Sequence, residues 1–370
     1  MVDGLVKGLS GLLKARGVDV VEGTGRLAGG GVDVTGSDGE TRRLETKNVI
    51  VATGSQPRAI PGYDFDGHRV VSSREALDWT ERPQRVAVIG AGAIGSEFAS
   101  LLGDAGSEVH LFEMLDQVVP GAEPEAAKTL ARELKKKGVK VRTGVAVGPA
   151  EVHDSRVVIP FEGDYVEVDK VLVAVGRAPV TDNVGLETTN AVVERGFVHV
   201  DAETLMTDEP GVYAVGDIVV GTPQMAHAGF AECIAAITHI ATGETAPVDY
   251  RAIPLVVYTH PEVASVGLTE AAARDAGYDI EVHDHGMRGV GRAIIQGEVG
   301  GMVKIVSEVD GAILGATVVG PGAGELIHEL MYAVAWEALP AEAAAFIHAH
   351  PTVSEAIGET LLSAAGRSLH

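Results

Sequence analysis

The sequence predicts an α/β fold in which a parallel sheet with helices on its faces is followed by an α+β region. Between residues 84 and 145, strand-like runs alternate with runs at helical spacing, which is the order of a parallel sheet flanked by helices. From about residue 251 the pattern changes to long strands, GGMVKIVSE and AILGATVVG, with Ala-rich helices. The 370 residues suffice for two or three domains.

The first part of the chain predicts one helix and then a set of strands. Residues 1–16 place Leu5, Leu9, Leu12 and Leu13 at helical spacing, which indicates an amphipathic helix. Residues 18–54 are β-rich runs separated by glycine turns, and the GSDG turn between two of them predicts a hairpin. Residues 55–83, rich in Pro, Gly and Arg, read as a connector.

The middle of the chain predicts a strand–helix–strand–helix–strand unit. Its segments are RVAVIG, AIGSEFASLLGDAG, EVHLFE, EPEAAKTLARELKKKG and VKVRTG. Residues 146–177 are mostly strands, and residues 206–242 hold a short strand, GVYAVGD, followed by a long helix.

Composition excludes several function classes. The net charge of −23, from 29 Lys and Arg against 52 Asp and Glu, argues against a nucleic-acid partner. No apolar run reaches the ~20 residues of a membrane span and no leader opens the chain, so we expect a cytoplasmic protein without a membrane partner. The single cysteine, Cys233, excludes an intrachain disulfide within these residues, and its place in an Ala/Ile-rich helix predicts a buried, inert thiol.

A dinucleotide fingerprint stands between the first predicted strand and helix of the middle unit. It is GAGAIG, in which Gly90 permits the tight turn, Gly92 admits the pyrophosphate and Gly95 allows close helix packing. The helix N-terminus supplies N–H donors to the phosphates. Glu113, at the end of the next strand, should bind the ribose hydroxyls and repel a 2′-phosphate, which favours NAD over NADP.

The C-terminal motif HAHPTVSE places His350 five residues before Glu355. An imidazole–carboxylate pair would fix the tautomer of His350 and raise its basicity, as a general base requires. The alternative is structural, because Thr352 and Glu355 also fit a capping box. The HDH sequence at 283–285 indicates a solvated edge strand rather than a metal site, and we expect no metal.

Several segments, taken together and in order, resemble the pyridine nucleotide–disulfide oxidoreductases. They are NVIVATGSQP (48–57), RVAVIGAGAIGSEFA (85–99), VLVAVGRAPV (171–180), TDEPGVYAVGDI (207–218), QMAHAGFAE (224–232), YTHPEVASVGLTE (258–270) and HAHPTVSE (348–355). The resemblance implies two Rossmann-like domains and a C-terminal α+β dimerisation domain. The implied boundaries are 1–80 and 206–250 for the two parts of an FAD domain, 81–205 for the NAD domain and 251–370 for the dimerisation domain.

The resemblance also implies cofactors, partners and residue roles. It implies NAD and FAD, a homodimer, and oxidation of dihydrolipoyl groups on the lipoyl domains of a 2-oxoacid dehydrogenase complex. His350 corresponds to the base that activates a dithiol, with Glu355 as its orienting partner. The positions matching cofactor contacts are Thr53, Gly54, Ser55, Asp217, Met225, Ala226 and His227 for FAD, and Gly90, Gly92, Ala93, Ile94, Gly95, Glu97, Glu113, Val145 and Gly176 for NAD or the adjoining flavin face.

The chain departs from the family in one respect. Members open with a further strand–GxGxxG–helix unit for the FAD pyrophosphate and a C-x4-C redox pair, and neither occurs in these residues. Without the paired thiols, electrons cannot pass to a disulfide by exchange, so we expect the chain as given to be inactive or incomplete. A late start site, a separate polypeptide and a decayed paralogue remain as explanations. The alternative functions are a non-catalytic NAD-binding dimer partner and another disulfide reductase of the family.

Overall fold

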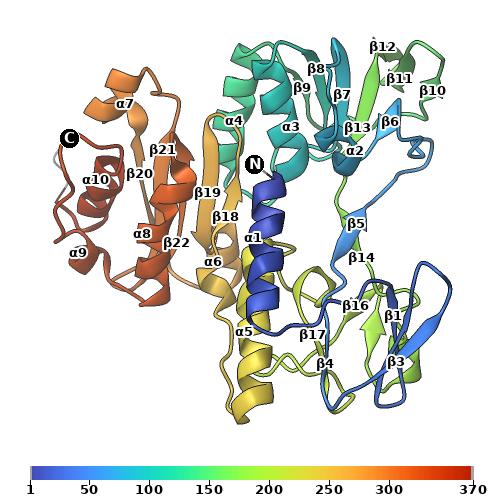
Figure 1. Ribbon diagram of the computed structural model, residues 1–370. Coiled ribbons are helices and arrows are strands. Elements are labelled where there is room, and N and C mark those ends of the chain that lie inside the picture. The colour runs from blue at the N-terminus through green and yellow to red at the C-terminus, as the bar shows by residue number, and fades with distance from the viewer. Residues whose placement is uncertain (1, 368–370) are drawn as a thin grey trace. The chain divides into compact units, whose positions relative to one another are not determined.

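The computed structural model describes residues 2–367, and its contacts divide the chain into two compact units (Figure 1). Unit 1 joins the chain up to Gln56 with Pro179–Val248. Unit 2 joins Pro57–Ala178 with the chain from Asp249 onward. The chain passes between the units three times: within the short strands β5 (Ser55–Pro57) and β14 (Arg177–Pro179), and again after Val248.

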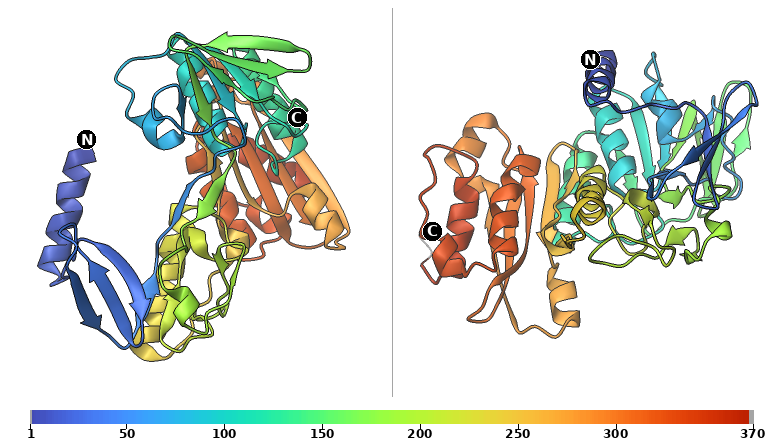
Figure 2. Two further views of the ribbon diagram at one scale, coloured as in Figure 1. Left: turned by 90° about the vertical axis from the view of Figure 1, so that its right-hand side faces the viewer. Right: turned by 60° about the horizontal axis from the view of Figure 1, so that its bottom comes forward.

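Unit 1 begins with the predicted amphipathic helix, α1 (Val2–Ala15), none of whose described residues is buried. Figure 2 shows α1 standing clear of the antiparallel strands that follow it. These strands are β1 (Thr24–Ala28), β2 (Gly31–Thr35) and β3 (Thr41–Glu45). The GSDG segment joins β2 to β3, so the predicted hairpin is confirmed.

The rest of unit 1 is built around a parallel strand pair, β4 (Val49–Val51) and β17 (Val212–Ala214). After β17 the chain makes a single 3₁₀ turn, η2 (Gly216–Ile218), and then the long predicted helix α5 (Ala226–Thr242). The remaining elements are η1 (Leu186–Thr188), β15 (Val193–Glu194) and β16 (Phe197–Val198). Val51, Val212 and Ala214 contribute to the small apolar core beneath this pair.

Unit 2 contains the predicted parallel sheet, in the order β6-β13-β7-β8-β9. The strands are β6 (Val70–Val71), β7 (Arg85–Ile89), β8 (Glu108–Phe112), β9 (Lys140–Arg142) and β13 (Lys170–Val173). The helices are α2 (Ser73–Leu77), α3 (Ala93–Asp104) and α4 (Pro124–Lys136). A small antiparallel sheet adds β10 (Glu151–Val152), β11 (Val157–Phe161) and β12 (Asp164–Val168).

The C-terminal part of unit 2 is a five-stranded antiparallel sheet in the order β18-β19-β22-β21-β20. The strands are β18 (Leu255–Val257), β19 (Glu262–Gly267), β20 (Ile280–Gly286), β21 (Met302–Glu308) and β22 (Ile313–Gly320). The helices are α6 (Glu270–Asp275), α7 (Gly291–Gln296), α8 (Ala323–Ala335), α9 (Pro340–Ala343) and α10 (Glu355–Ala364), with η3 (Tyr250–Ala252) and η4 (Met287–Gly289). β20 is an edge strand, as the HDH motif predicts.

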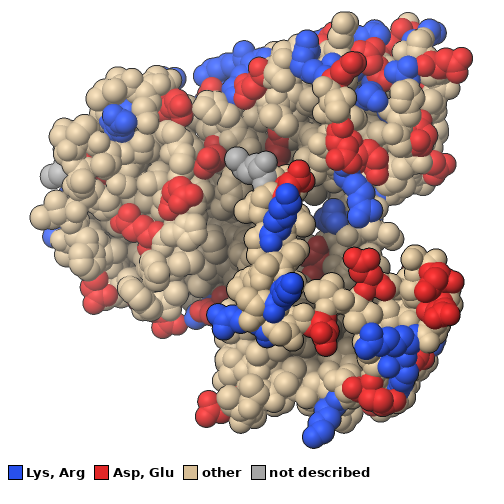
Figure 3. All heavy atoms as spheres, viewed as in Figure 1, with Lys and Arg blue, Asp and Glu red and all other residues tan. Residues whose placement is uncertain are grey.

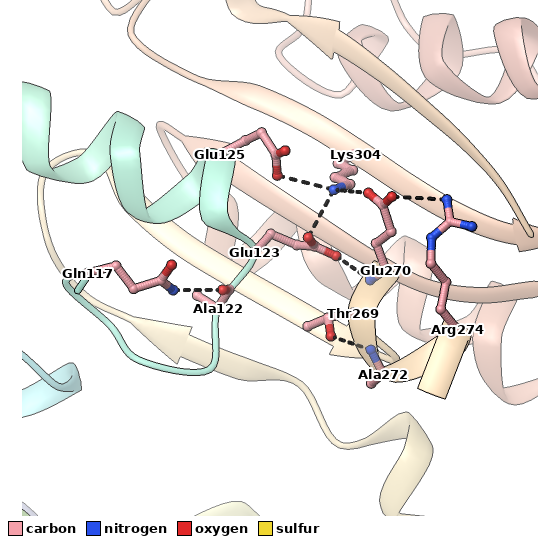
Figure 4. Close-up of polar contacts among 9 residues, drawn as sticks. All are labelled: Gln117, Ala122, Glu123, Glu125, Thr269, Glu270, Ala272, Arg274 and Lys304. Atoms are coloured by element: carbon pink, nitrogen blue, oxygen red, sulfur yellow. Dashed lines mark hydrogen bonds and ion pairs between the residues drawn. The ribbon is translucent and has the colours of Figure 1, made fainter. Parts of the chain in front are cut away.

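A buried lysine links the parallel-sheet part of unit 2 to its C-terminal part (Figure 4). The Nζ atom of Lys304, on β21, lies 2.9 Å from Glu123, 3.1 Å from Glu125 and 2.9 Å from Glu270. Burial alone would lower the pKa of the Lys304 ammonium, but the three carboxylates outweigh burial and raise it. Glu123 precedes α4 and Glu270 begins α6, so one ammonium fixes the start of two helices.

The surface carries charges of both signs, but unevenly (Figure 3). On the face shown, the area formed by the C-terminal part of unit 2 is mostly uncharged. The exposed large apolar side chains of the C-terminal part of unit 2 include Tyr332, Trp336, Phe346 and Ile347. None of the helices among the described residues is long and apolar enough to cross a membrane. Cys233 on α5 is partly exposed, so the expectation of a buried thiol is wrong.

Candidate functional site

The glycine loop lies between the end of β7 at Ile89 and the start of α3 at Ala93. A Cβ atom on Gly95 would stand 1.8 Å from the carbonyl oxygen of Gly90, so this helix packs against the loop more closely than any side chain allows. Gly92, in contrast, has no other atom within 4 Å of where its Cβ would be. No side chain of the described residues caps α3, so its N-terminal N–H groups stay available to an anion.

Glu113 follows β8 and is buried at the edge of the glycine loop. Its Oε2 accepts the N–H of Ala91 at 2.7 Å, and its Oε1 accepts the N–H of Leu115 at 2.9 Å. Each carboxylate oxygen has a second lone pair that can accept a hydroxyl proton. The backbone therefore fixes this carboxylate in one orientation before any ligand arrives.

A cavity of about 510 Å³ opens beside the loop and Glu113. Five positions singled out from the sequence lie together in its wall: Gly90, Gly92, Glu113, Val145 and Gly176. Sequence reasoning missed the apolar remainder of the wall, which includes Ile60, Phe112, Met114, Leu115, Pro120 and Val147. Apolar walls with a few fixed polar groups are typical of a cofactor site.

Three further predicted positions, Ala93, Ile94 and Gly95, form the first turn of α3 and do not line this cavity. Glu97 lies one turn further along α3 and also stands apart from it. Its carboxylate accepts the N–H of Tyr258 at 2.9 Å. Burial raises the pKa of the Glu97 carboxyl, although the Tyr258 hydrogen bond acts in the other direction.

In unit 1 the residues that resemble flavin contacts lie in the segment after β4, on η2 and at the start of α5. Ser55 donates its hydroxyl to the carboxylate of Asp217, and Thr53 donates to the carbonyl of Val180. Gly54 adopts a positive φ of 67°, and its carbonyl accepts the N–H of Val180 at 2.8 Å. The structure thus brings Ser55 and Asp217 into contact across 162 residues of sequence.

The start of α5 lies beside the same turn. Met225 is the N-cap residue, Ala226 and His227 open the helix, and no side chain of the described residues caps it. Gln224 donates its side-chain amide to the carbonyl of Asp217 at 3.2 Å. The buried Glu232 accepts the Gly216 N–H at 2.5 Å and so holds η2 against α5. A carboxylate, a hydroxyl and an uncapped helix start therefore converge here, which suits sugar hydroxyls and an anion.

The predicted pair at the C-terminal end is present. The Nδ1 atom of His350 lies 2.8 Å from Oε1 of Glu355, and the His350 side chain is 78% exposed. Oε2 of Glu355 accepts the Thr352 N–H at 2.9 Å. This backbone bond and then the His350 bond lower the pKa of Glu355. Only this backbone half of the predicted capping box forms, because the N-cap residue of α10 is Ser354 and the Thr352 hydroxyl donates to the Ala349 carbonyl instead.

The segment that carries His350 holds a further imidazole–carboxylate pair, which sequence reasoning missed. Nε2 of His348 lies 2.8 Å from Oε1 of Glu329 on α8. The hydrogen bond to Glu329 raises the pKa of His348, although burial opposes it. The HAHP motif contains the signal for a second histidine, but Glu329 stands 19 residues earlier, beyond any local pattern.

Comparison with known proteins places this geometry in a family. Residues 1–233 match the model "Pyridine nucleotide-disulphide oxidoreductase", and residues 253–361 match the dimerisation domain of the same family. Dihydrolipoyl dehydrogenases of Haloferax volcanii and Bacillus subtilis are each 38% identical over all of this chain, which covers 80% and 81% of their lengths. That of Chlorobaculum tepidum is 40% identical over 97% of this chain and 77% of its own length.

Solved structures agree with this assignment. The crystal structure of LpdA from Mycobacterium tuberculosis gives a TM-score of 0.90 at 27% identity, covering 98% of this chain and 80% of that one. The HOCl-induced flavoprotein disulfide reductase RclA from Escherichia coli gives 0.83 at 25% identity, covering 93% and 79%. The predicted α/β fold with a C-terminal dimerisation domain is confirmed. The chain belongs to the pyridine nucleotide-disulphide oxidoreductase family.

Proposed function

We propose that this chain is a dihydrolipoyl dehydrogenase-like flavoprotein oxidoreductase, of the kind that passes electrons between dihydrolipoyl groups, FAD and NAD, and that these 370 residues by themselves support only the hydride exchange between NAD and FAD. The observation that carries the proposal is the cavity where Gly90, Gly92 and Glu113 meet at the start of α3. Its relatives named dihydrolipoyl dehydrogenase supply the substrate class, a dithiol carried by a 2-oxoacid dehydrogenase complex. A homodimer follows from the dimerisation domain over residues 253–361.

NAD fits the residues of the cavity. The free N–H groups at the uncapped start of α3 would bind the pyrophosphate. The empty space beside Gly92 would let the pyrophosphate approach the backbone closely. Glu113 would accept the ribose hydroxyls and would repel a 2′-phosphate, which selects NAD over NADP. Asp217, Ser55 and the start of α5 would hold sugar hydroxyls and the charge of FAD. When bound, NAD exchanges a hydride with the flavin.

His350 would act on the substrate thiol. Glu355 holds Nδ1 of the imidazole, which leaves Nε2 to accept a proton. Oxidation of a dithiol to a disulfide releases two electrons and two protons. One proton would leave with the two electrons as the hydride, and His350 would take the other from the thiol and release it to solvent. The redox thiol pair that the family uses is not among these 370 residues, whose only cysteine is Cys233.

The two half-reactions separate this proposal from a non-catalytic NAD-binding dimer partner. The purified chain with added FAD is mixed anaerobically with NADH or with dihydrolipoamide, and the flavin absorbance is followed. We expect NADH to bleach the flavin and dihydrolipoamide to leave it oxidised, because the hydride step needs no cysteine. NAD binding without any flavin binding would favour the dimer partner. Turnover of dihydrolipoamide at an ordinary rate would show the thiol argument to be wrong.

A further inference from the structure

The loop that carries His350 is exposed over most of its length. Among the described residues 345–351, only His348 is not exposed. The preceding residues Phe346 and Ile347 have exposed apolar side chains, and Ala349, His350 and Pro351 are exposed as well. The position of the proposed base therefore depends on contacts made by its neighbours.

His348 supplies such contacts on two helices. Its side chain is only 13% exposed, and Nε2 pairs with Glu329 of α8 at 2.8 Å. On its other side the ring lies against α10, where a Cβ atom on Gly358 would stand 2.6 Å from Nδ1. The ring thus fills the space that a side chain at residue 358 would need, between two helices that pack against the same sheet.

We propose that His348, held by Glu329, is a positioning residue that fixes the loop on which His350 meets Glu355. The proposal rests on the proposed function only for the role of His350 as the base. Two imidazole–carboxylate pairs then clamp one loop: His348 ties it to α8, and His350 ties it to α10. Thr352 also donates its hydroxyl to the carbonyl of Ala349, the residue between the two histidines, at 2.7 Å. This bond links the segment held by His348 to the segment where His350 meets Glu355.

We expect the ion pair between His348 and Glu329 to depend on pH. The charged groups that act on His348 are Glu329 of α8 and Glu355 of α10. Because these carboxylates raise the pKa of His348, the ion pair is complete below the ordinary histidine value of about 6.5 and is lost as the pH rises through the raised folded value. The loop should therefore loosen on the alkaline side.

Amide exchange measured by NMR on the 370-residue chain tests this role. The probe is the N–H of Thr352, which is bonded to Glu355 and does not contact Glu329. In Glu329→Gln we expect a lower pKa for His348 and a protection factor for Thr352 reduced about tenfold, as one charge-assisted hydrogen bond supports. In the unaltered chain the same loss should appear above the pKa of His348.

Two further variants make the result decisive. Glu325→Gln, an exposed carboxylate one turn earlier on α8, is the matched control and should change neither value. In a double-mutant cycle, Glu329→Gln should add nothing to His348→Asn, because the two side chains act as one unit. Unchanged protection in Glu329→Gln, or equal loss in Glu325→Gln, overturns the positioning role. The readout needs neither NAD nor thiols, so failure of NAD or flavin binding would contradict the proposed function alone.

Discussion

Replacing Lys304 with Met should lower the free energy of unfolding by about 3–5 kcal/mol, the usual cost of leaving a buried charge without its partner. The Lys304 and Glu123 side chains are 4% and 3% exposed. Without the ammonium, Glu123 keeps the Glu270 N–H at 2.6 Å as its remaining recorded donor. The methionine chain fills the same space, so the loss arises from charge rather than from packing.

The other two carboxylates contribute less to this cost. Glu125 is 54% exposed and Glu270 is partly exposed, so water can replace the lysine around them. Glu125→Gln is therefore the matched control, and it should change the free energy of unfolding by less than about 1 kcal/mol. The double variant Lys304→Met with Glu123→Gln contains no buried charge at this point and should recover most of the lost stability.

Urea unfolding followed by tryptophan fluorescence measures these differences. Trp79 and Trp336 lie in the two parts of unit 2 that the lysine connects, so both should report its loss. A Lys304→Met variant within about 1 kcal/mol of the unaltered chain would refute the argument from buried charge. A double variant as unstable as the single one would assign the cost to packing instead.

Three other outcomes follow from the same contacts. Gly95→Ala should lower the free energy of unfolding by about 1–3 kcal/mol and weaken NAD binding, because its methyl group meets protein atoms. Gly92→Ala should weaken NAD binding alone, because its methyl group meets none. Urea unfolding measures the stability of each variant, and calorimetry measures its NAD affinity. Glu113→Gln should cost about 1–3 kcal/mol, because its amide nitrogen must face a backbone N–H, and unfolding as stable as the unaltered chain would contradict this. Lys304 and then Arg274 lower the pKa of Glu270, so this carboxylate stabilises the fold above its unfolded pKa of about 4.3 and ceases to do so as the pH falls through the lowered folded value. The difference in unfolding free energy between the unaltered chain and Lys304→Met should therefore become smaller over that acidic range. A difference that stays constant with pH would argue against this.

Much of the fold could be predicted because its signals are local. The alternation of strands and helices between residues 84 and 145 appears as β7, α3, β8, α4 and β9. Gly90, Gly92 and Glu113 could be linked because the motif's spacing encodes their meeting. The pairing of His350 with Glu355 is also local, since five residues separate them. The three boundaries between the predicted domain segments stay a prediction.

The remaining contacts depend on packing between distant segments. Nothing in the sequence near Lys304 indicates that Glu123, 181 residues earlier, will neutralise it. The pairing of His348 with Glu329 likewise requires α8 and α10 to pack on one sheet. The backbone bonds to Glu113 arise from how the loop after β8 folds back toward Ala91. Local patterns predict elements and loops, whereas buried charge pairs emerge only once those elements pack.

The most direct test of the account is a calorimetric titration of the purified chain with NAD and with NADP. We expect NAD to bind with a Kd at least ~10-fold lower than that of NADP, since Glu113 would face the 2′-phosphate. We also expect Gly92→Ala to weaken NAD binding while the chain stays folded. Equal or tighter binding of NADP, or unchanged NAD affinity in Gly92→Ala, would contradict the assignment of this cavity.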